Sequence, residues 1–165
     1  MGYITPTNNS IALNYLSRTE VGINQVLILL VIVMSKKFFV KIVSDPDVDL
    51  RKCVVGVACA AQAINDGYDV GVFFAANGVK MLNAEFIENL NNSGMLPDGM
   101  IHKMMETITR SAASVYCSTG SQAANGVTKE NAAEILLAGY DDWMTWSGPP
   151  GVIALSAASD VQLVY

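Results

Sequence analysis

Short, mainly apolar segments alternate with longer amphipathic ones along this sequence, and this alternation constrains the fold more than any other feature. The apolar segments include KFFVKIV at residues 37–43, VGVFF at 70–74 and SVYC at 114–117. Segments of this length are typical of strands that are buried on both faces of a parallel sheet. The sequence therefore predicts repeated strand–helix–strand units.

Between these strands, apolar residues recur at three- and four-residue steps, as they do on the buried face of a helix. Asp45 and Pro46 are suited to the cap and the first turn of a helix over residues 46–66, which Gly67 ends. Further helical patterns cover residues 79–90, 100–108 and 150–158, and another helix is expected to begin at Thr128.

A Gly- and Ser-rich turn is expected over residues 118–126, a fourth strand within 140–146, and a last strand over 161–165. Together these elements predict a three-layer α/β/α fold with a mainly parallel five-stranded sheet. In such folds, ligands and reacting groups lie outside the carboxyl ends of the strands.

Residues 1–33 differ from the rest, because Arg18 and Glu20 are the only charged side chains among them. The apolar run at residues 26–34 is too short for a membrane span, which needs about 20 residues. We interpret 1–33 as an N-terminal extension or as an artefact of the assigned start, and 34–165 as the folded domain.

The composition excludes several classes of protein. With 165 residues, 52% of them hydrophobic and 15% charged, the chain is not intrinsically disordered. Its formal net charge of -5 argues against direct DNA binding, since the whole molecule repels a polyanion. No membrane association is expected.

Three cysteines, Cys53, Cys59 and Cys117, are too few for a disulfide framework, and the single histidine, His102, cannot complete a zinc site with them. We therefore predict a reducing, cytoplasmic setting, with no metal and no cofactor. The loop SDPDVD at residues 44–49 argues against a nucleotide, because its aspartates repel phosphate and Pro46 lacks an N–H donor.

Cys117 is the candidate reactive residue, because it lies at the carboxyl end of a predicted strand. A helix N-terminus nearby stabilises a thiolate by about 1 kcal/mol, which would bring the pKa toward neutrality. Supporting hydrogen bonds are expected from the loop that follows, which consists of Ser118, Thr119, Gly120 and Ser121. The alternative, a buried structural cysteine at a strand end, remains equally open.

Several cysteine chemistries are excluded by what surrounds Cys117. A C-x5-R phosphatase loop needs arginine at position 123, which is Ala123. A papain-like site needs a histidine base, but His102 is expected on the solvent side of its helix. Thioredoxin chemistry lacks a second cysteine at short spacing.

The other cysteines, the methionines and the aromatic residues are expected in the core, at the carboxyl edge or at contacts between subunits. Cys53 is expected in the core, whereas Cys59 is expected to be exposed or at a subunit contact. The methionines are expected to fill the core, with a mobile lid as the alternative; they are Met81, Met95, Met100, Met104 and Met105. The aromatic residues 140–146 are expected to close the carboxyl edge or to pack at an oligomer interface.

Over nearly all of residues 34–165 the sequence resembles the DsrE/DsrF-like family of sulfur-relay proteins, which have the YchN-like fold. The resemblance rests on KFFVKIV, NDGYDVGVFF, NGVKML, VYCSTGSQAANGVTKE and ASDVQLVY, in this order. It implies a three-layer domain that assembles as a trimer or hexamer. It also implies that Cys117 accepts sulfane sulfur as a persulfide, with sulfur-donor and sulfur-acceptor proteins as partners.

The function hypothesis is therefore a sulfur carrier or sulfurtransferase that works through a Cys117 persulfide. Two rivals remain. One is an oligomeric binding or regulatory module in which Cys117 is structural. The other is a thiol peroxidase or redox sensor that forms a sulfenic acid at Cys117, with Cys53 or Cys59 as the resolving thiol.

Overall fold

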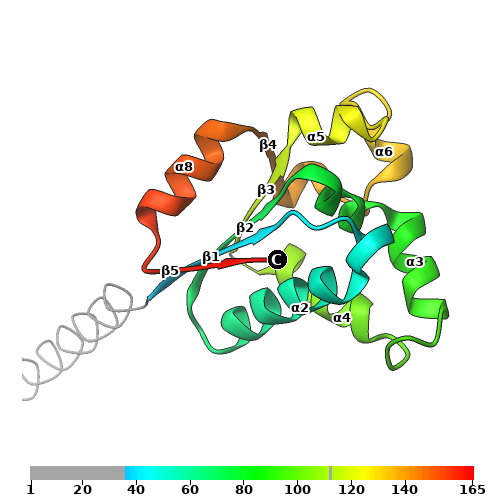
Figure 1. Ribbon diagram of the computed structural model, residues 1–165, viewed down its shortest axis with the longest axis horizontal. Helices are drawn as coiled ribbons and strands as arrows, with labels where there is room; N and C mark the ends of the chain where they lie inside the picture. Colours follow the sequence, from blue (N-terminus) through cyan, green and yellow to red (C-terminus); the bar gives the residue numbers. More distant parts are fainter. Residues whose placement is uncertain (1–35, 112) are drawn as a thin grey trace, which may run out of the picture. The chain divides into compact units, whose positions relative to one another are not determined.

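The computed structural model of the protein describes residues 36–111 and 113–165, within a compact unit that spans Lys36–Tyr165. The sheet and its helices belong to this unit (Figure 1). The predicted extension at residues 1–33 lies outside the described residues.

Five strands form one sheet in which every neighbouring pair is parallel, in the order β4-β3-β2-β1-β5. The strands are β1 (Lys37–Ile42), β2 (Asp69–Phe74), β3 (Ser114–Ser118), β4 (Met144–Ser147) and β5 (Val161–Val164). The predicted sheet is confirmed, and the fourth strand begins near the end of the window in which it was expected.

The helices fill the connections between these strands. They are α2 (Pro46–Asn65), the 3-10 helix η1 (Ala76–Leu82), α3 (Ala84–Asn92), α4 (Met100–Arg110), α5 (Thr119–Ala124), α6 (Ala132–Ile135), α7 (Tyr140–Trp143) and α8 (Pro149–Ala158). As predicted, Asp45 caps α2 by accepting a hydrogen bond from Asp47 N at 3.1 Å.

The strand order explains why the helices divide between two faces of the sheet. From β1 to β4 each strand is added on the same side, and the chain then crosses the whole sheet to place β5 beyond β1. Because parallel crossovers are right-handed, reversing the direction places the connecting helix on the opposite face. That helix is α8, which Figure 1 shows across the sheet from α2 and α4. The three-layer arrangement is therefore confirmed.

The core lies mainly between the sheet and the α2–α4 layer. Val40, Val72 and Phe74 of the central strands have no exposed surface, and they belong to one apolar cluster with Val57 of α2 and Ile108 of α4. On the other face α8 packs closely over β2. A Cβ atom at Gly71 would lie 2.7 Å from Leu155 Cδ2, so a larger residue would force the Leu155 side chain to move.

Three connections differ from the sequence prediction. Residues 118–126 contain the helix α5 rather than a turn alone, because Ser118 caps it by accepting from Ser121 N at 3.2 Å. The helix predicted from Thr128 is reduced to α6, because Leu137 N leaves the helical path and donates to Leu82 O at 2.9 Å. The stripe over residues 79–90 is divided into η1 and α3 by Asn83.

Candidate functional site

Three loops meet at the carboxyl edge of the sheet, where β1, β2 and β3 end. Main-chain and side-chain hydrogen bonds hold them together. Ala75 N, after β2, donates to Ile42 O of β1 at 3.0 Å. Ala76 N donates to Ser121 Oγ of α5 at 2.9 Å, which joins the second loop to the third. The candidate site is therefore built on rigid elements at the predicted edge of the sheet.

A charged cluster occupies the side of this edge that follows β1 and β2. Lys80 Nζ lies 2.9 Å from Asp45 Oδ1 and 2.6 Å from Asp47 Oδ2. The hydrogen bond from Lys80 is the main cause that lowers the pKa of Asp45, and the bond to Asp47 is the main cause that raises the pKa of Lys80. Two carboxylates facing one ammonium leave a negative charge, which disfavours a phosphate ligand here.

The loop after β2 has an unusual backbone. Ala76 has a φ of +47°, and it is the one non-glycine residue with positive φ in the described part of the chain. Such a conformation costs about 1–3 kcal/mol for a residue with a side chain, and it persists only where the surroundings enforce it. The hydrogen bond from Ala76 N to Ser121 is one such constraint.

Cys117 lies in β3 one residue before the end of the strand, and its thiol points into the core. Its side chain has no exposed surface, and its Sγ contacts only Ser118 O, at 3.9 Å, among the hydrogen bonds of the described residues. Burial raises the pKa of the Cys117 thiol from 9.0 to about 12. The expected half-ionised thiol is wrong for this conformation, because the ~1 kcal/mol from a helix N-terminus is smaller than the cost of burying a charge.

The four residues expected to support the thiol lie directly after it, but their polar groups bind elsewhere. Ser118 and Ser121 share a hydrogen bond between their hydroxyls at 2.9 Å, and Ser118 also caps α5. Thr119 and Gly120 are exposed in the first turn of α5. These residues therefore shape the β3–α5 junction, and the hydrogen bonds of the two serines stabilise α5 rather than a thiolate.

Gln122 was not predicted as a site residue, and it is the side chain that faces the thiol. It is 1% exposed, and its amide partly offsets the rise in the pKa of Cys117. Its Nε2 nevertheless reaches no acceptor at hydrogen-bonding geometry among the described residues, the thiol included. The one sequence signal for it was a glutamine in a stretch of small residues, five positions after the cysteine.

A hollow of about 250 Å³ opens beside Gln122 at the carboxyl edge. Polar groups from three loops converge on it together with apolar side chains. Its lining consists of Asp47, Val79, Lys80, Asn83, Phe86, Gln122, Asn125 and Val127. This mixture of an apolar wall and a few convergent polar groups is typical of a small-molecule site.

The other two cysteines lie away from this hollow. Cys53 is fully buried in α2, as predicted, and its thiol donates to Ser44 O at 3.3 Å. Burial is the main cause that raises the pKa of Cys53 to about 11. Cys59, expected to be exposed or at a subunit contact, is half-buried and accepts a hydrogen bond from Tyr165 Oη at 3.1 Å.

The remaining candidates divide between core and surface. His102 is exposed as predicted, with Nε2 at 3.2 Å from Glu88 Oε2. Core filling is confirmed for Met81, Met104 and Met105, whereas Met95 and Met100 are 57% and 42% exposed. In the aromatic segment, Trp146 of β4 is the register partner of Cys117 in β3. The ring of Tyr140 packs edge-on against the ring of Trp146, with 6.4 Å between their centroids.

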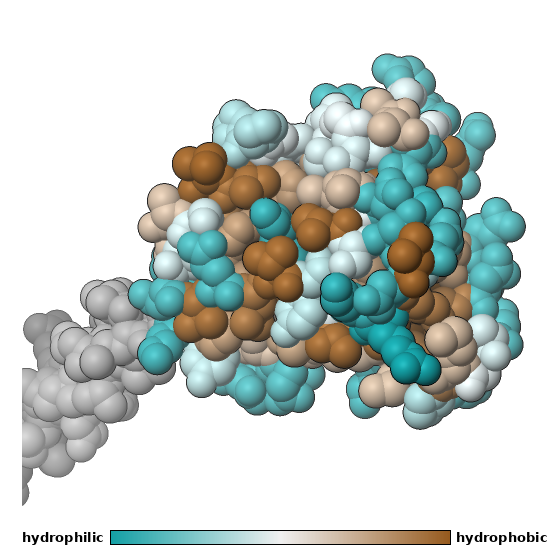
Figure 2. All heavy atoms as spheres, in the orientation of Figure 1, coloured by the Kyte–Doolittle hydropathy of each residue, from teal (hydrophilic) through white to brown (hydrophobic). Residues whose placement is uncertain are grey.

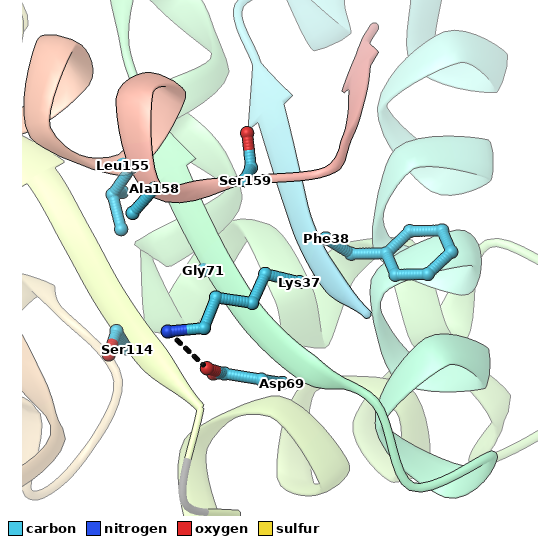
Figure 3. Close-up of a pocket in the computed structure, with 8 residues that line it drawn as sticks. All are labelled: Lys37, Phe38, Asp69, Gly71, Ser114, Leu155, Ala158 and Ser159. Carbon is cyan, nitrogen blue, oxygen red and sulfur yellow. Dashed lines mark ion pairs between the residues drawn. The ribbon is translucent and has the colours of Figure 1, made fainter. Parts of the chain in front are cut away.

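A second hollow lies at the opposite, amino edge of the sheet (Figure 3). Lys37 and Asp69 form an ion pair there at 3.4 Å, and each side chain is 53% exposed. An exposed pair of this kind contributes less than about 1 kcal/mol and recruits no particular ligand. The carboxyl-edge hollow is therefore the stronger candidate.

The described residues contain neither a candidate metal site nor a candidate membrane span. Within residues 36–111 and 113–165, no group of three His, Cys, Asp or Glu side chains is placed to hold a metal ion. In the same residues, no helix has the length and apolar character to span a membrane.

Comparison with known proteins gives a relationship of fold but not of sequence. No family model matches the chain, and no curated protein matches it in sequence. Among solved structures, the ychN protein from E. coli superposes with a TM-score of 0.52 at 14% sequence identity. The match covers 80% of this chain and 100% of the ychN chain. The domain is thus similar in fold to ychN, with a five-stranded parallel sheet between two helical layers.

Proposed function

We propose that this protein is a sulfur carrier in which Cys117 takes up sulfane sulfur as a persulfide. The observation that carries the proposal is the junction of β3 and α5, where a free thiol meets an unpartnered amide beside a polar hollow. The similarity of fold to ychN supports it.

The proposed transfer conserves atoms and electrons. The Cys117 thiolate attacks the outer sulfur of a donor persulfide, R–S–SH, so that a new S–S bond forms and the donor leaves as a thiolate. An acceptor thiolate then attacks the outer sulfur, and Cys117 returns to its starting state. Both steps are thiol–disulfide-type exchanges, so no external oxidant or reductant is consumed.

The resting fold does not present the thiol, so the reaction requires a local opening. Helix α5 has six residues, and Ser121 Oγ holds its first turn by accepting from Ala76 N and donating to Ser118 Oγ. Four of the six residues of α5 are exposed, and short surface elements open more readily than the buried core strands. A displacement of α5 would expose Cys117 and lower the pKa of its thiol, since burial is the cause of the shift.

The first prediction concerns sulfur uptake. After incubation with a polysulfide donor, the intact wild-type chain is expected to gain about 32 Da, the mass of one sulfur atom, and to lose it on reduction. The Cys117→Ser variant is expected to gain nothing, because a hydroxyl cannot form a persulfide. Intact mass spectrometry of both proteins makes the comparison.

A matched control is Cys59→Ser, which removes the more accessible thiol but leaves the β3–α5 junction unchanged. Uptake is expected to persist in this variant. Sulfur uptake in Cys117→Ser equal to that of the wild type would refute the carrier role. A gain of one oxygen atom by the wild type on treatment with hydrogen peroxide, together with no gain of sulfur from polysulfide, would favour the redox-sensor alternative.

A second candidate function has one observation in its favour. The complete burial of Cys117 fits a binding or regulatory module in which this cysteine only fills the core. The two candidates differ in the alkylation of Cys117 during sulfur loading. In a carrier the loaded Cys117 is alkylated on its outer sulfur and gains the mass of the alkyl group plus about 32 Da, whereas a structural cysteine reacts with neither reagent until the protein unfolds.

We also propose that the protein is a homo-oligomer that associates through α8. The outward residues of this helix are apolar at helical spacing; they are Pro150, Ile153, Ala154 and Ala157. Ile153 is 67% exposed, and Figure 2 shows apolar residues gathered over α8. A helix that is apolar all around is normally covered, which favours a contact with another chain.

The second prediction tests this contact. The Ile153→Glu variant is expected to have a smaller mass in solution than the wild type, because the buried charge would oppose association. Size-exclusion chromatography with light scattering measures the mass. Val48→Glu is the matched control, since Val48 is 84% exposed but lies on α2. An unchanged mass in both variants would place the contact elsewhere or show a monomer.

A further inference from the structure

The buried amide of Gln122 has a hydrogen-bonding capacity that the resting protein leaves unused. The residue is 1% exposed, and its Nε2 has no partner among the described residues. A buried donor without an acceptor destabilises a fold, so natural structures rarely retain one without a reason. The backbone around Gln122 is by contrast well bonded, since Val127 N donates to Gln122 O at 2.9 Å.

The position of this side chain links two features of the site. On one side its amide faces the Cys117 thiol, and on the other it lines the hollow of about 250 Å³. A sulfur atom added to Cys117 would need space and a partner in this direction, because the rest of the thiol's surroundings is the apolar core that contains Val115 and Met144.

We propose that Gln122 is the binding group for the transferred sulfur, with its Nε2 donating a hydrogen bond to the outer sulfur of the Cys117 persulfide. This inference rests on the proposed carrier function. The outer sulfur of a persulfide is an acceptor, and as an anion it forms a charge-assisted hydrogen bond, which is stronger than one between neutral groups. Loading would thus satisfy the donor that is unpartnered in the resting state.

The neighbouring amide provides a contrast. Asn125 lines the same hollow, but its Nδ2 already donates to Ser121 O at 2.9 Å. The ammonium of Lys80 is likewise engaged by Asp45 and Asp47. Among the lining residues, Gln122 is the one with a buried side-chain donor that has no partner.

The test compares Gln122→Met with the wild type. Methionine has a similar size and shape but no donor. The variant is expected to load at Cys117 and then to lose the outer sulfur to an added small thiol about tenfold faster or more, as judged from the decay of the 32 Da adduct. Its melting temperature without sulfur is expected to equal or exceed that of the wild type, since no buried donor is left unpaired.

Gln62→Met is the matched control, because it makes the same replacement at an exposed glutamine of α2 away from the hollow, and it is expected to keep the wild-type rate of sulfur loss. Equal decay rates in Gln122→Met and the wild type would overturn the role of Gln122 and leave the carrier function intact. A melting temperature of Gln122→Met well below that of the wild type would show that Nε2 is bonded in the resting protein, which also overturns it. If the wild type takes up no sulfur at all, both the carrier function and this role fall.

Discussion

Cys117 of the folded protein is expected to react with iodoacetamide at least a hundredfold more slowly than an unhindered thiol at pH 7. A pKa of about 12 leaves about one thiol in 10⁵ as thiolate, about a thousandfold less than the ordinary value of 9.0 allows. A more basic thiolate is also a better nucleophile, with a Brønsted coefficient of about 0.4–0.5, and over three pKa units this returns a factor of about 15–30. Steric exclusion, with no thiol surface exposed, slows the reaction further.

The rate at which iodoacetamide alkylates Cys117 is expected to rise with pH. The folded state favours the protonated thiol, so the rate is expected to rise about tenfold per pH unit from pH 7 to pH 10, without the plateau that a thiol of ordinary pKa approaches near pH 9–10. Labelling of a Cys53→Ala, Cys59→Ala variant, followed by mass spectrometry, isolates Cys117. Reaction at the rate of a free thiol at pH 7 would show that the β3–α5 junction is open in solution.

Replacing Gly78 by alanine is expected to lower the free energy of unfolding by about 3 kcal/mol or more. Gly78 lies in η1, where the chain passes directly over the end of β1. A Cβ atom there would overlap Ile42 O and would lie 2.7 Å from Ile42 C. Backbone atoms of a central strand cannot move aside as a flexible side chain does, so the loop itself must shift.

Gly120→Ala provides the matched control for this substitution. A Cβ atom at Gly120 would meet nothing within 4 Å, and the residue lies in α5, where alanine is favoured over glycine by up to about 1 kcal/mol. This variant is expected to be as stable as the wild type or more stable. Urea denaturation measures both, and a Gly78→Ala variant within about 0.5 kcal/mol of the wild type would contradict the close approach.

The elements that were predicted correctly are those in which local pattern and tertiary environment agree. β2 is apolar on both faces and five of its six residues are buried, and α2 begins at its cap Asp45 and packs an apolar face against the core. In these elements the pattern of hydrophobic residues in the sequence agrees with the burial that the element has in the fold.

The predictions that were wrong fall where long-range contacts outweigh local preference. The helix expected from Thr128 ends at Ile135, because Leu137 pairs with the distant Leu82. The segment after Cys117 forms α5, because Ser118 caps it and Ser121 holds it to Ala76. The Leu137–Leu82 and Ser121–Ala76 bonds have no signature in the neighbouring residues, whereas the Ser118 cap is a local signal that the sequence prediction did not use.

The sequence by itself determined the class of fold, the number of strands and the position of Cys117 at the carboxyl edge, because these follow from local periodicity and from the order of the elements. Only the tertiary structure decided the state of the thiol and the identity of its neighbour. Whether a thiol ionises depends on the atoms packed around it, and here these include Trp146 from β4 and the unpartnered amide of Gln122. The sequence shows that Cys117 lies at the end of a strand, whereas the burial of its thiol and the side chain that faces it follow only from the folded structure.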